Sequence, residues 1–565
     1  MKKIRIGIVI FLIILMPVSL TFQSCEKILP IIDFALEVLS KTGWKQSEEK
    51  MDNIPEDITP FDDEDGDTPM DKFKSLEDKF PPIGDQGQYG TCVAWSVGYN
   101  LKTALNAIEK GWSSSQLADK SNQCSPYDLW KSINKAGKAG SGCNGTNFEP
   151  ALDAIIQNGV ESLSSVPYTT SLNCSDKSPK GNSDNKLANY RKIASENEGL
   201  TPENFKGYLN AGRPISIGAK LGDRFMKWDN SNILNNDTYN NPGMQHAYHA
   251  MVLSGYDDNK QAFRVRNSWG TGWGDNGSIW VDYDFFCKSF CFAAFVAQNP
   301  TVSSPSIGSS GAGDDLLAFK AEDYPCTDDS RFNRTFIYDV YNSGTTTISP
   351  SQKWHIAYMI YNAKNAKEYE IIYYDYFTTE YGDNSDHFGA MPETTNSPGY
   401  MPSLTGGYWN NFTKKSGENV GTDEDGDYYE ISYKMPSKHS NGKPITGDYY
   451  LVLMADAYDV IKEVNEDNNF YFITAGDGKP LQFINGEVQN MPSKTKSSMQ
   501  HSSKCPALFS NTEDQTLVKP GNLNAYTPQE IQTMLLHDKK TGKLDAKIKA
   551  YNENAGYNRA KKTRK

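Results

Sequence analysis

Three short strings far apart in the sequence place the strongest constraint on the fold of this chain. The first, DQGQYGTCVAWS, covers residues 85–96 and contains Cys92. The second, QHAYHAMVLSGY at 245–256, contains His249, and the third, RNSWGTGWG at 266–274, contains Asn267. If these residues act together, the fold has to bring the three strings to one place.

A thiol, an imidazole and a carboxamide in this order are the parts of a Cys-His-Asn nucleophile. A neutral thiol is a weak nucleophile, so the site has to lower the pKa of Cys92. The apolar run from Val93 to Leu101 predicts a buried helix that begins at Cys92, and its positive end favours a thiolate. His249 would pair with the thiolate and protonate the leaving amine, while Asn267 would orient the ring.

The three strings resemble the papain-like cysteine peptidases, over roughly Leu76 to Pro300. In that family a glutamine six residues before the cysteine helps to bind the oxyanion, and Gln86 stands at that spacing. Such a donor lowers the barrier by about 3 kcal/mol. The resemblance also implies that Trp269 shields the hydrogen bond between His249 and Asn267 from water.

A second histidine lies close to the first. His246 is three residues from His249, but the family places Gly-Tyr six residues after its catalytic histidine. Gly255 and Tyr256 therefore select His249, and His246 is expected at the rim of the site.

The string GCNGT at 142–146 resembles the family's Gly-Cys-Asn-Gly-Gly, whose glycines pair with the substrate backbone as an extra strand. Thr146 replaces the second glycine, so we expect a narrower approach for the substrate. The family's usual Cys-Gly-Ser-Cys-Trp lacks its first cysteine here, which excludes the disulfide that this cysteine makes. The expected substrate-binding residues are Gly145, Thr146, Tyr248 and Trp269.

The N-terminus has the pattern of a targeting segment. Basic residues precede an apolar run from Ile6 to Leu20, which is short for a helix that stays in the membrane. Ser24-Cys25 follows, and it resembles a bacterial lipoprotein signal with a relaxed lipobox. Cleavage before Cys25 would leave its thiol to carry lipid, and several acyl chains give durable anchoring. The alternative is an ordinary secretory signal that is cleaved elsewhere.

The remaining cysteines fit an exported protein. Without Cys25 and Cys92 seven are left, so at least one is free or pairs outside the chain. The sequence leaves open Cys143 with Cys174 or Cys124, and Cys287 with Cys291. No Cys/His cluster has convincing zinc spacing, so we expect no metal and no cofactor. The net charge of −13 gives no support for nucleic-acid binding.

The length of 565 residues predicts more than one domain. We expect a signal peptide at 1–24, a tether or short pro-region at 25–75, the peptidase domain at 76–300 and a Ser/Gly/Pro linker at 301–313. A second domain at 314–476 and a C-terminal extension at 477–565 follow. The extension is expected to hold one helical segment, Gln529 to Leu536, before a loosely ordered basic end.

The expected fold class is an α+β papain-like domain, with a helical half and a β-barrel half, followed by an all-β immunoglobulin-like sandwich. The helices are expected at Pro126–Ala136 and Pro150–Gln157, and strands from about Pro214 onward. The strands near Thr335 and Gly447 resemble the bacterial cell-adhesion-related domain called CARDB. A glycan or a protein is the expected ligand of that domain, if it binds one.

The sequence therefore predicts a lipid-anchored cysteine endopeptidase of the bacterial cell envelope, periplasmic or surface-facing, that acts on proteins or peptides through a thioester on Cys92. Two alternatives remain at this point. One is a surface binding or adhesion protein with a silenced peptidase scaffold. The other is an acyl or peptidyl transferase that passes the thioester to an amine with the same three residues.

Overall fold

The computed structural model describes residues 41–59, 70–195, 200–237, 247–300, 354–378, 436–463, 469–475, 478–490 and 524–554, and the backbone of further strands between 316 and 564. The chain divides into two compact units. The first unit contains 71–186 and 194–295 together with residues up to 49. The second contains 50–70, 187–193 and 296–565. The expected positions of Cys25 and His246, and of the linker at 301–313, lie outside the described residues.

The helical part of unit 1 is built around the helix that begins at Cys92. It continues as a π-helical stretch, Ala94–Lys102, in which every residue is buried, and then as α3, Thr103–Lys110. Ser125 caps α5, Pro126–Lys135, and Pro126 occupies the first turn, where its missing N–H costs nothing. These helices confirm the predicted elements at 92 and 126. The others in this part are α4 (Ser114–Ala118) and α6 (Phe148–Asn158).

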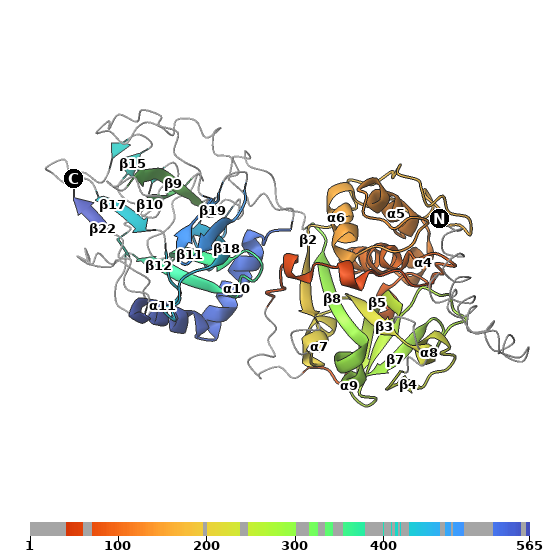
Figure 1. Cartoon of the computed structure of the whole chain (residues 1–565). Helices are drawn as coiled ribbons and strands as arrows, with labels where there is room; N and C mark the ends of the chain where they lie inside the picture. The colour runs from red at the N-terminus through yellow and green to blue at the C-terminus, as the bar shows by residue number, and fades with distance from the viewer. Residues whose placement is uncertain are drawn as a thin grey trace, which may run out of the picture. The chain divides into compact units, whose positions relative to one another are not determined.

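The sheet of unit 1 follows, with the order β8-β3-β5-β6-β7-β4 and with β1 paired to β5. In Figure 1 the helices α5 and α6 lie above these strands. Ser96 Oγ donates to the carbonyl of Met251 at 2.7 Å, so the Cys92 helix is fastened to the middle of β5. The strands are β1 (Phe73–Ser75), β3 (Ile215–Leu221), β4 (Ile233–Leu234), β5 (Ala247–Asp257), β6 (Ala262–Arg266), β7 (Ser278–Asp282) and β8 (Cys291–Gln298).

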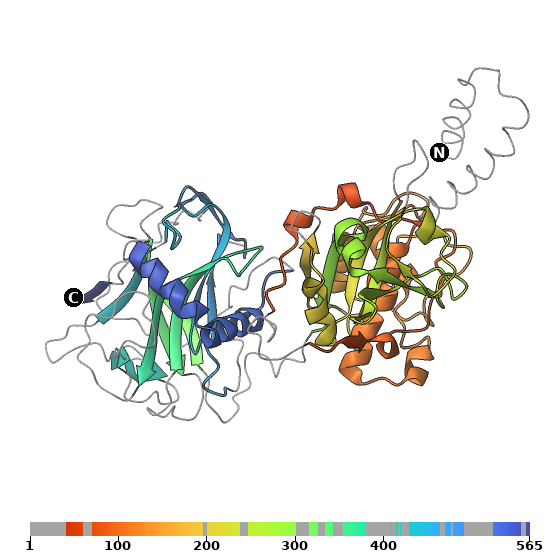
Figure 2. The ribbon, with the colours of Figure 1, turned by 90° about the horizontal axis from the view of Figure 1, so that it is seen from below.

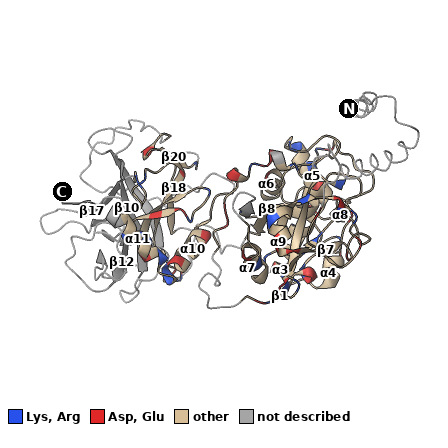
Figure 3. Cartoon of the chain, turned by 60° about the horizontal axis from the view of Figure 1, so that its bottom comes forward, with Lys and Arg blue, Asp and Glu red and all other residues tan. Residues whose placement is uncertain are grey.

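Further short helices and strands lie between residues 46 and 290. They are η2 (Gln46–Glu48), η3 (Met51–Asn53), η5 (Glu77–Lys79), β2 (Asn189–Ser195), α7 (Glu203–Asn210), α8 (Asp223–Met226), α9 (Tyr283–Phe285) and η8 (Phe286–Phe290). In the view of Figure 3, ribbon positions of Lys or Arg and of Asp or Glu are interspersed over the described elements of unit 1.

The cysteines of unit 1 settle one of the open pairings. Cys143 and Cys174 form a disulfide. Cys124 is free, and so are Cys287 and Cys291. The open possibility of a Cys287–Cys291 disulfide is therefore not realised. Cys287 lies in η8, whereas Cys291 begins β8 and is buried.

Unit 2 contains two larger sheets, with the orders β14-β10-β17-β22 and β13-β12-β11-β18-β20-β21. An immunoglobulin-like sandwich stays a prediction. The strands are β9 (Leu316–Pro325), β10 (Arg334–Asn342), β11 (Trp354–Asn362), β12 (Tyr369–Thr378), β13 (Gly399–Tyr400), β14 (Tyr408–Trp409), β15 (Thr413–Lys415), β16 (Glu418–Asn419), β17 (Tyr429–Lys434), β18 (Gly447–Met454), β19 (Phe470–Ile473), β20 (Leu481–Ile484), β21 (Glu487–Val488) and β22 (Lys561–Arg564).

Two helices of the C-terminal extension pack on this unit. α10 (Pro528–Lys540) and α11 (Lys543–Asn554) bury Ile531, Leu544 and Ile548 in a core shared with β11 and β18. Figure 2 shows both helices lying across the strands. The expectation of a loosely ordered end after one helical segment is therefore wrong up to residue 554, because apolar residues at helical spacing find a sheet face to cover. No helix in the described part of the chain has the length and hydropathy that a bilayer crossing needs.

A buried arginine connects two distant segments within unit 2. The guanidinium of Arg191 is 1% exposed and forms two hydrogen bonds with the Glu530 carboxylate, at 2.9 and 2.7 Å. It also donates to Asn524 and lies over the Tyr526 ring. All of its charge is therefore compensated in the folded state, and loss of the guanidinium would leave the Glu530 charge buried.

Arg191→Ala should lower the free energy of unfolding of unit 2 by about 3–5 kcal/mol, because an uncompensated buried carboxylate remains. The measurement is hydrogen exchange of the α10 amides in urea. Lys288→Ala is the control, since the Lys288–Asp284 pair is exposed and its loss should leave the exchange of the α10 amides unchanged. Equal effects of the two substitutions would contradict the structural role of Arg191.

Candidate active site

Cys92 lies at the start of its helix and is completely buried. The backbone groups of Ala250, the residue after His249, and of Gly43 lie near enough to the thiol to oppose part of the rise in its pKa. The helix attachment to β5 therefore brings the thiol beside the strand that carries His249. The predicted juxtaposition of the first two strings is present in the structure.

His249 and Asn267 form the second part of the site. His249 Nε2 and Asn267 Oδ1 lie 2.8 Å apart, and both side chains are buried. The Trp269 ring lies against the imidazole, with centroids 4.8 Å apart. That it shields the hydrogen bond from water stays a prediction. The Nδ1 atom of His249 is buried and makes no hydrogen bond with the described residues. This nitrogen is the one left to exchange a proton.

Gln86 is held in place by the third string. Its backbone N–H donates to the Ser268 carbonyl at 2.9 Å, and its Oε1 accepts from Ser268 Oγ at 2.7 Å. These bonds fix the carboxamide so that Nε2 is the donor. Nε2 gives its hydrogen bonds to the carbonyls of Tyr89 and Lys41, both at 2.8 Å. The sequence pointed to Gln86 but not to Ser268, which resembles an ordinary turn residue.

Residues 41–49, here called the cover segment, bind to residues that the sequence predicts to contact the substrate. Gly43 accepts a hydrogen bond from the Thr146 N–H at 2.9 Å, and Lys45 donates to the Thr146 carbonyl at 3.1 Å. Trp44 and Thr146 thereby form a parallel β-bridge. The Trp44 N–H donates to the Tyr248 carbonyl at 3.3 Å. The expected substrate residues Thr146 and Tyr248 thus bind the chain's own backbone.

The Gly43 backbone passes very close to the loop before Cys92. A Cβ atom on Gly43 would lie 2.1 Å from the Gly90 carbonyl oxygen, and one on Gly145 would lie 2.4 Å from the Gly43 oxygen. Only a chain without side chains at these points can approach so closely. The cover segment is therefore packed directly against the predicted nucleophile loop and Gly145.

The far end of the cover segment is held by Glu49. Its carboxylate accepts from the backbone N–H groups of Phe148 and Glu149, at 2.8 and 3.1 Å, in the first turn of α6. It also accepts from Trp44 Nε1 at 2.8 Å. Burial raises the pKa of Glu49, although these donors oppose the shift. The carboxylate satisfies helix N–H groups that would otherwise lack partners.

Burial also sets the ionisation of the two central groups. It raises the pKa of the Cys92 thiol to about 11 and lowers the pKa of His249 to about 4. Both groups are neutral at pH 7 in this arrangement. The expected low pKa of Cys92 is therefore absent here, because burial removes the water that a thiolate and an imidazolium need.

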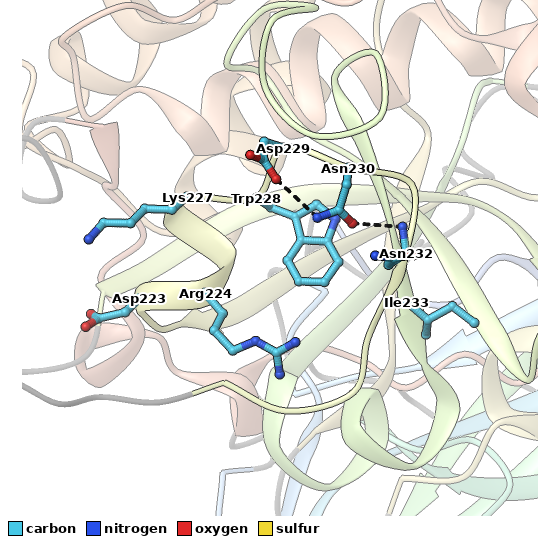
Figure 4. A pocket seen from close by; sticks show the side chains of 8 residues that line it. All are labelled: Asp223, Arg224, Lys227, Trp228, Asp229, Asn230, Asn232 and Ile233. Atoms are coloured by element: carbon cyan, nitrogen blue, oxygen red, sulfur yellow. Dashed lines mark hydrogen bonds between the residues drawn. The ribbon is translucent and has the colours of Figure 1, made fainter.

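A separate open pocket lies at α8 (Figure 4). Phe225 of α8 packs on Trp269 and Trp273, so the aromatic layer that covers His249 also supports this helix. The pocket is lined by Asp223, Arg224, Lys227, Trp228, Asp229, Asn230, Asn232 and Ile233. None of these is a predicted catalytic residue. Over the described ranges, no group of three or more His, Cys, Asp or Glu side chains is arranged to hold a metal.

Comparison with known proteins locates the family resemblance. Residues 70–290 match the family described as papain family cysteine protease. Cysteine proteinase 2 of Entamoeba histolytica is 32% identical over 206 residues, which are 36% of this chain and 60% of that protein. Oryzain beta chain of Oryza sativa is 26% identical over 229 residues, 39% of this chain and 44% of that protein. The chain thus spans about 60% or less of these relatives.

Among solved structures, xylellain, a cysteine protease from Xylella fastidiosa, is 18% identical with a TM-score of 0.37, covering 46% of this chain and 97% of that chain. The match at 70–290 lies over the helices and strands that hold Cys92, His249 and Asn267. Residues 70–290 are a papain-family cysteine protease domain with an α+β fold.

Proposed function

We propose that the chain is a cysteine endopeptidase that hydrolyses peptide bonds of proteins or peptides through a thioester on Cys92. The observation that carries the proposal is the convergence of Cys92, the His249–Asn267 pair and the Gln86 amide on one buried spot. Each part then has a chemical task. Intact residues at all four positions favour catalysis over a silenced scaffold.

In the proposed reaction, the Cys92 sulfur attacks the peptide carbonyl carbon, and the thiol proton passes to His249 Nδ1. The carbonyl oxygen becomes an oxyanion, stabilised by Gln86 Nε2 and the Cys92 backbone N–H. His249 then gives its proton to the departing amine, and the C–N bond breaks to leave a thioester. In the second half-reaction, water gives a proton to His249 as its oxygen attacks the thioester carbon. The C–S bond then breaks, the carboxylic acid product leaves, and His249 returns the proton to the Cys92 sulfur. Asn267 holds the ring through Nε2.

We propose further that the cover segment keeps the site closed. The Lys41 carbonyl accepts the hydrogen bond from Gln86 Nε2, and the Gly43 backbone lies beside the Cys92 thiol. A substrate carbonyl needs both of these places. The thiol is also neutral in this state. The segment therefore has to leave before a peptide can bind, and its release restores water to the thiol and the imidazole.

The proposed location is the bacterial cell envelope, with lipid on Cys25 and with proteins or peptides as partners. The support is the basic, apolar and Ser24-Cys25 pattern of the sequence. About fifty residues separate Cys25 from the peptidase domain. We also propose a glycan or a protein as the ligand of unit 2. We do not propose that the chain binds nucleic acid.

Cys92→Ala should abolish peptide hydrolysis without loss of folding, because no thioester can form. The measurement is release of a fluorescent peptide product, with circular dichroism as the test of folding. Turnover by the pure variant would contradict the mechanism and favour a different nucleophile.

A graded series serves as the control for the roles of the other residues. Asn267→Ala should lower kcat less than His249→Ala, since the amide only orients the ring. Gln86→Ala should cost roughly 10²–10³-fold in kcat. If His249→Ala kept its activity and His246→Ala lost it, His246 rather than His249 would be the catalytic histidine.

Trp44→Ala should speed iodoacetamide labelling of Cys92 at pH 7 at least tenfold. The Trp44 side chain is 4% exposed, and loss of a buried indole costs about 3–5 kcal/mol, which weakens closure. In the unaltered chain the thiolate fraction should grow only as the pH rises towards the raised pKa of about 11. In the variant the labelling profile should shift to lower pH.

Labelling is read by mass mapping of the peptide that contains Cys92, because Cys287 is also partly accessible. Trp112→Ala is the matched control, since Trp112 contacts Lys110 and lies away from the cover segment. Identical labelling of Cys92 in all three proteins would mean that residues 41–49 do not close the site.

Cys25→Ser should release the protein from the membrane fraction or leave the signal uncleaved. The physical reason is that the serine hydroxyl cannot accept the thioether-linked lipid that holds the chain. The measurement combines cell fractionation with radiolabelled fatty acid. A wild-type protein that takes up no label, with a mature N-terminus away from Cys25, would indicate a freely secreted peptidase.

A further inference from the structure

The Tyr168 hydroxyl joins the two ends of the loop that precedes Cys92. It donates to the Gln86 carbonyl at 2.8 Å, and it lies 2.8 Å from Thr91 Oγ1. A phenol has a single proton to give. Because that proton goes to Gln86, the Thr91 hydroxyl is the donor in the second bond. One oxygen atom therefore holds residues 86 and 91 together.

The two ends of this loop carry the proposed oxyanion donors. Gln86 supplies its side-chain Nε2, and the Cys92 backbone N–H follows Thr91 directly. Ser268 already fixes the backbone N–H and the Oε1 atom of Gln86. Tyr168 fixes the Gln86 carbonyl, the group that Ser268 does not reach. Oxyanion donors work because they are in place before the charge develops. A hydroxyl that holds both ends of the loop therefore sets the spacing of the two donors.

Tyr168 is itself held in position. Its ring packs edge-on against Trp95, with centroids 4.9 Å apart, and Trp95 belongs to the helix that begins at Cys92. Two residues before Tyr168, the Val166 carbonyl accepts from the buried Ser125 Oγ at 2.6 Å. Burial raises the pKa of Tyr168 to about 12, so its hydroxyl keeps the proton that Gln86 receives.

Tyr89 makes a second link between the same two segments. Its hydroxyl donates to the Thr170 carbonyl and accepts from the Leu172 N–H, both at 3.0 Å. Tyr89 stands where the family's usual motif has the cysteine that this chain lacks. Two residues beyond Leu172, Cys174 is bonded to Cys143. Tyrosine hydroxyls thus fasten the loop at 86–91 to residues 168–172.

We propose that Tyr168 is a positioning residue for the reaction, and that its hydroxyl aligns the two oxyanion donors through Gln86 and Thr91. The inference rests on the peptidase function proposed above. Tyr168 acts through the loop and touches no reacting atom. Loss of a whole oxyanion donor costs about 10²–10³-fold in kcat, so loss of the alignment alone should cost less, about tenfold.

The test uses the full chain with Trp44→Ala as the parent, in which we expect the site to be open. Tyr168→Phe keeps the ring on Trp95 and removes only the hydroxyl. It should lower kcat for a quenched peptide about tenfold. Iodoacetamide should label Cys92 at the rate of the parent, because alkylation of the sulfur forms no oxyanion.

Tyr127→Phe is the matched control. The Tyr127 hydroxyl donates to the Asn173 carbonyl at 3.2 Å, so this variant also loses one tyrosine bond to the segment after Tyr168. That bond does not involve residues 86–91. Both kcat and the labelling of Cys92 should therefore stay at the level of the parent.

Thr91 provides a second variant that leaves Tyr168 in place. Thr91→Val removes the hydroxyl at nearly constant shape and should also lower kcat, whereas Thr91→Ser keeps the donor and should restore most of it. In a Gln86→Ala background, Tyr168→Phe should cost less than about threefold, because one of the two donors that it aligns is gone.

An unchanged kcat in Tyr168→Phe would overturn the proposal, and so would an equal fall of hydrolysis and alkylation, which indicates a general loss of structure. If Tyr168→Phe does not fold, an unchanged kcat in Thr91→Val overturns it instead. If the parent cuts no peptide although Cys92 is labelled readily, the peptidase function itself fails, and the role of Tyr168 fails with it.

Discussion

Removal of water from Cys92 and His249 is the physical constraint on which the observed state of unit 1 depends. A thiolate and an imidazolium are both stabilised by solvent, and burial penalises each charged form. Beneath residues 41–49 the pair is neutral, with the thiol pKa raised to about 11 and the imidazole pKa lowered to about 4. In the proposed closed state, the contacts that block access to the site also control its chemistry.

The catalytic half of the fold could be predicted because its signals are local and chemical. A helix that begins at Cys92 follows from the glycines before it and the apolar run after it. The position of His249 on β5, hydrogen-bonded to Asn267, needed knowledge of the family, because no local pattern brings residues 18 positions apart into contact. Ser268 holds the Gln86 amide in place, but nothing in the sequence distinguishes it from an ordinary turn residue.

The cover segment was expected only as a tether or short pro-region. It has no helical or strand periodicity that would predict a packed element. Its structure comes from partners far away in the sequence: Thr146 for its backbone, Phe148 and Tyr248 for the ring of Trp44, and the first turn of α6 for Glu49. In the same way, the packing of α10 and α11 depends on a sheet face that the sequence did not reveal. Tertiary contacts, rather than local propensity, order both segments.

The attachment of the cover segment to the same polypeptide has a consequence for competition. A tethered ligand acts at a fixed effective concentration, commonly in the millimolar range for short links, and dilution does not dissociate it. A peptide that competes for Thr146 binds only the open fraction, so its apparent dissociation constant is the intrinsic one divided by that fraction. In the proposed closed state, the free energy with which residues 41–49 bind would therefore set a threshold of substrate concentration.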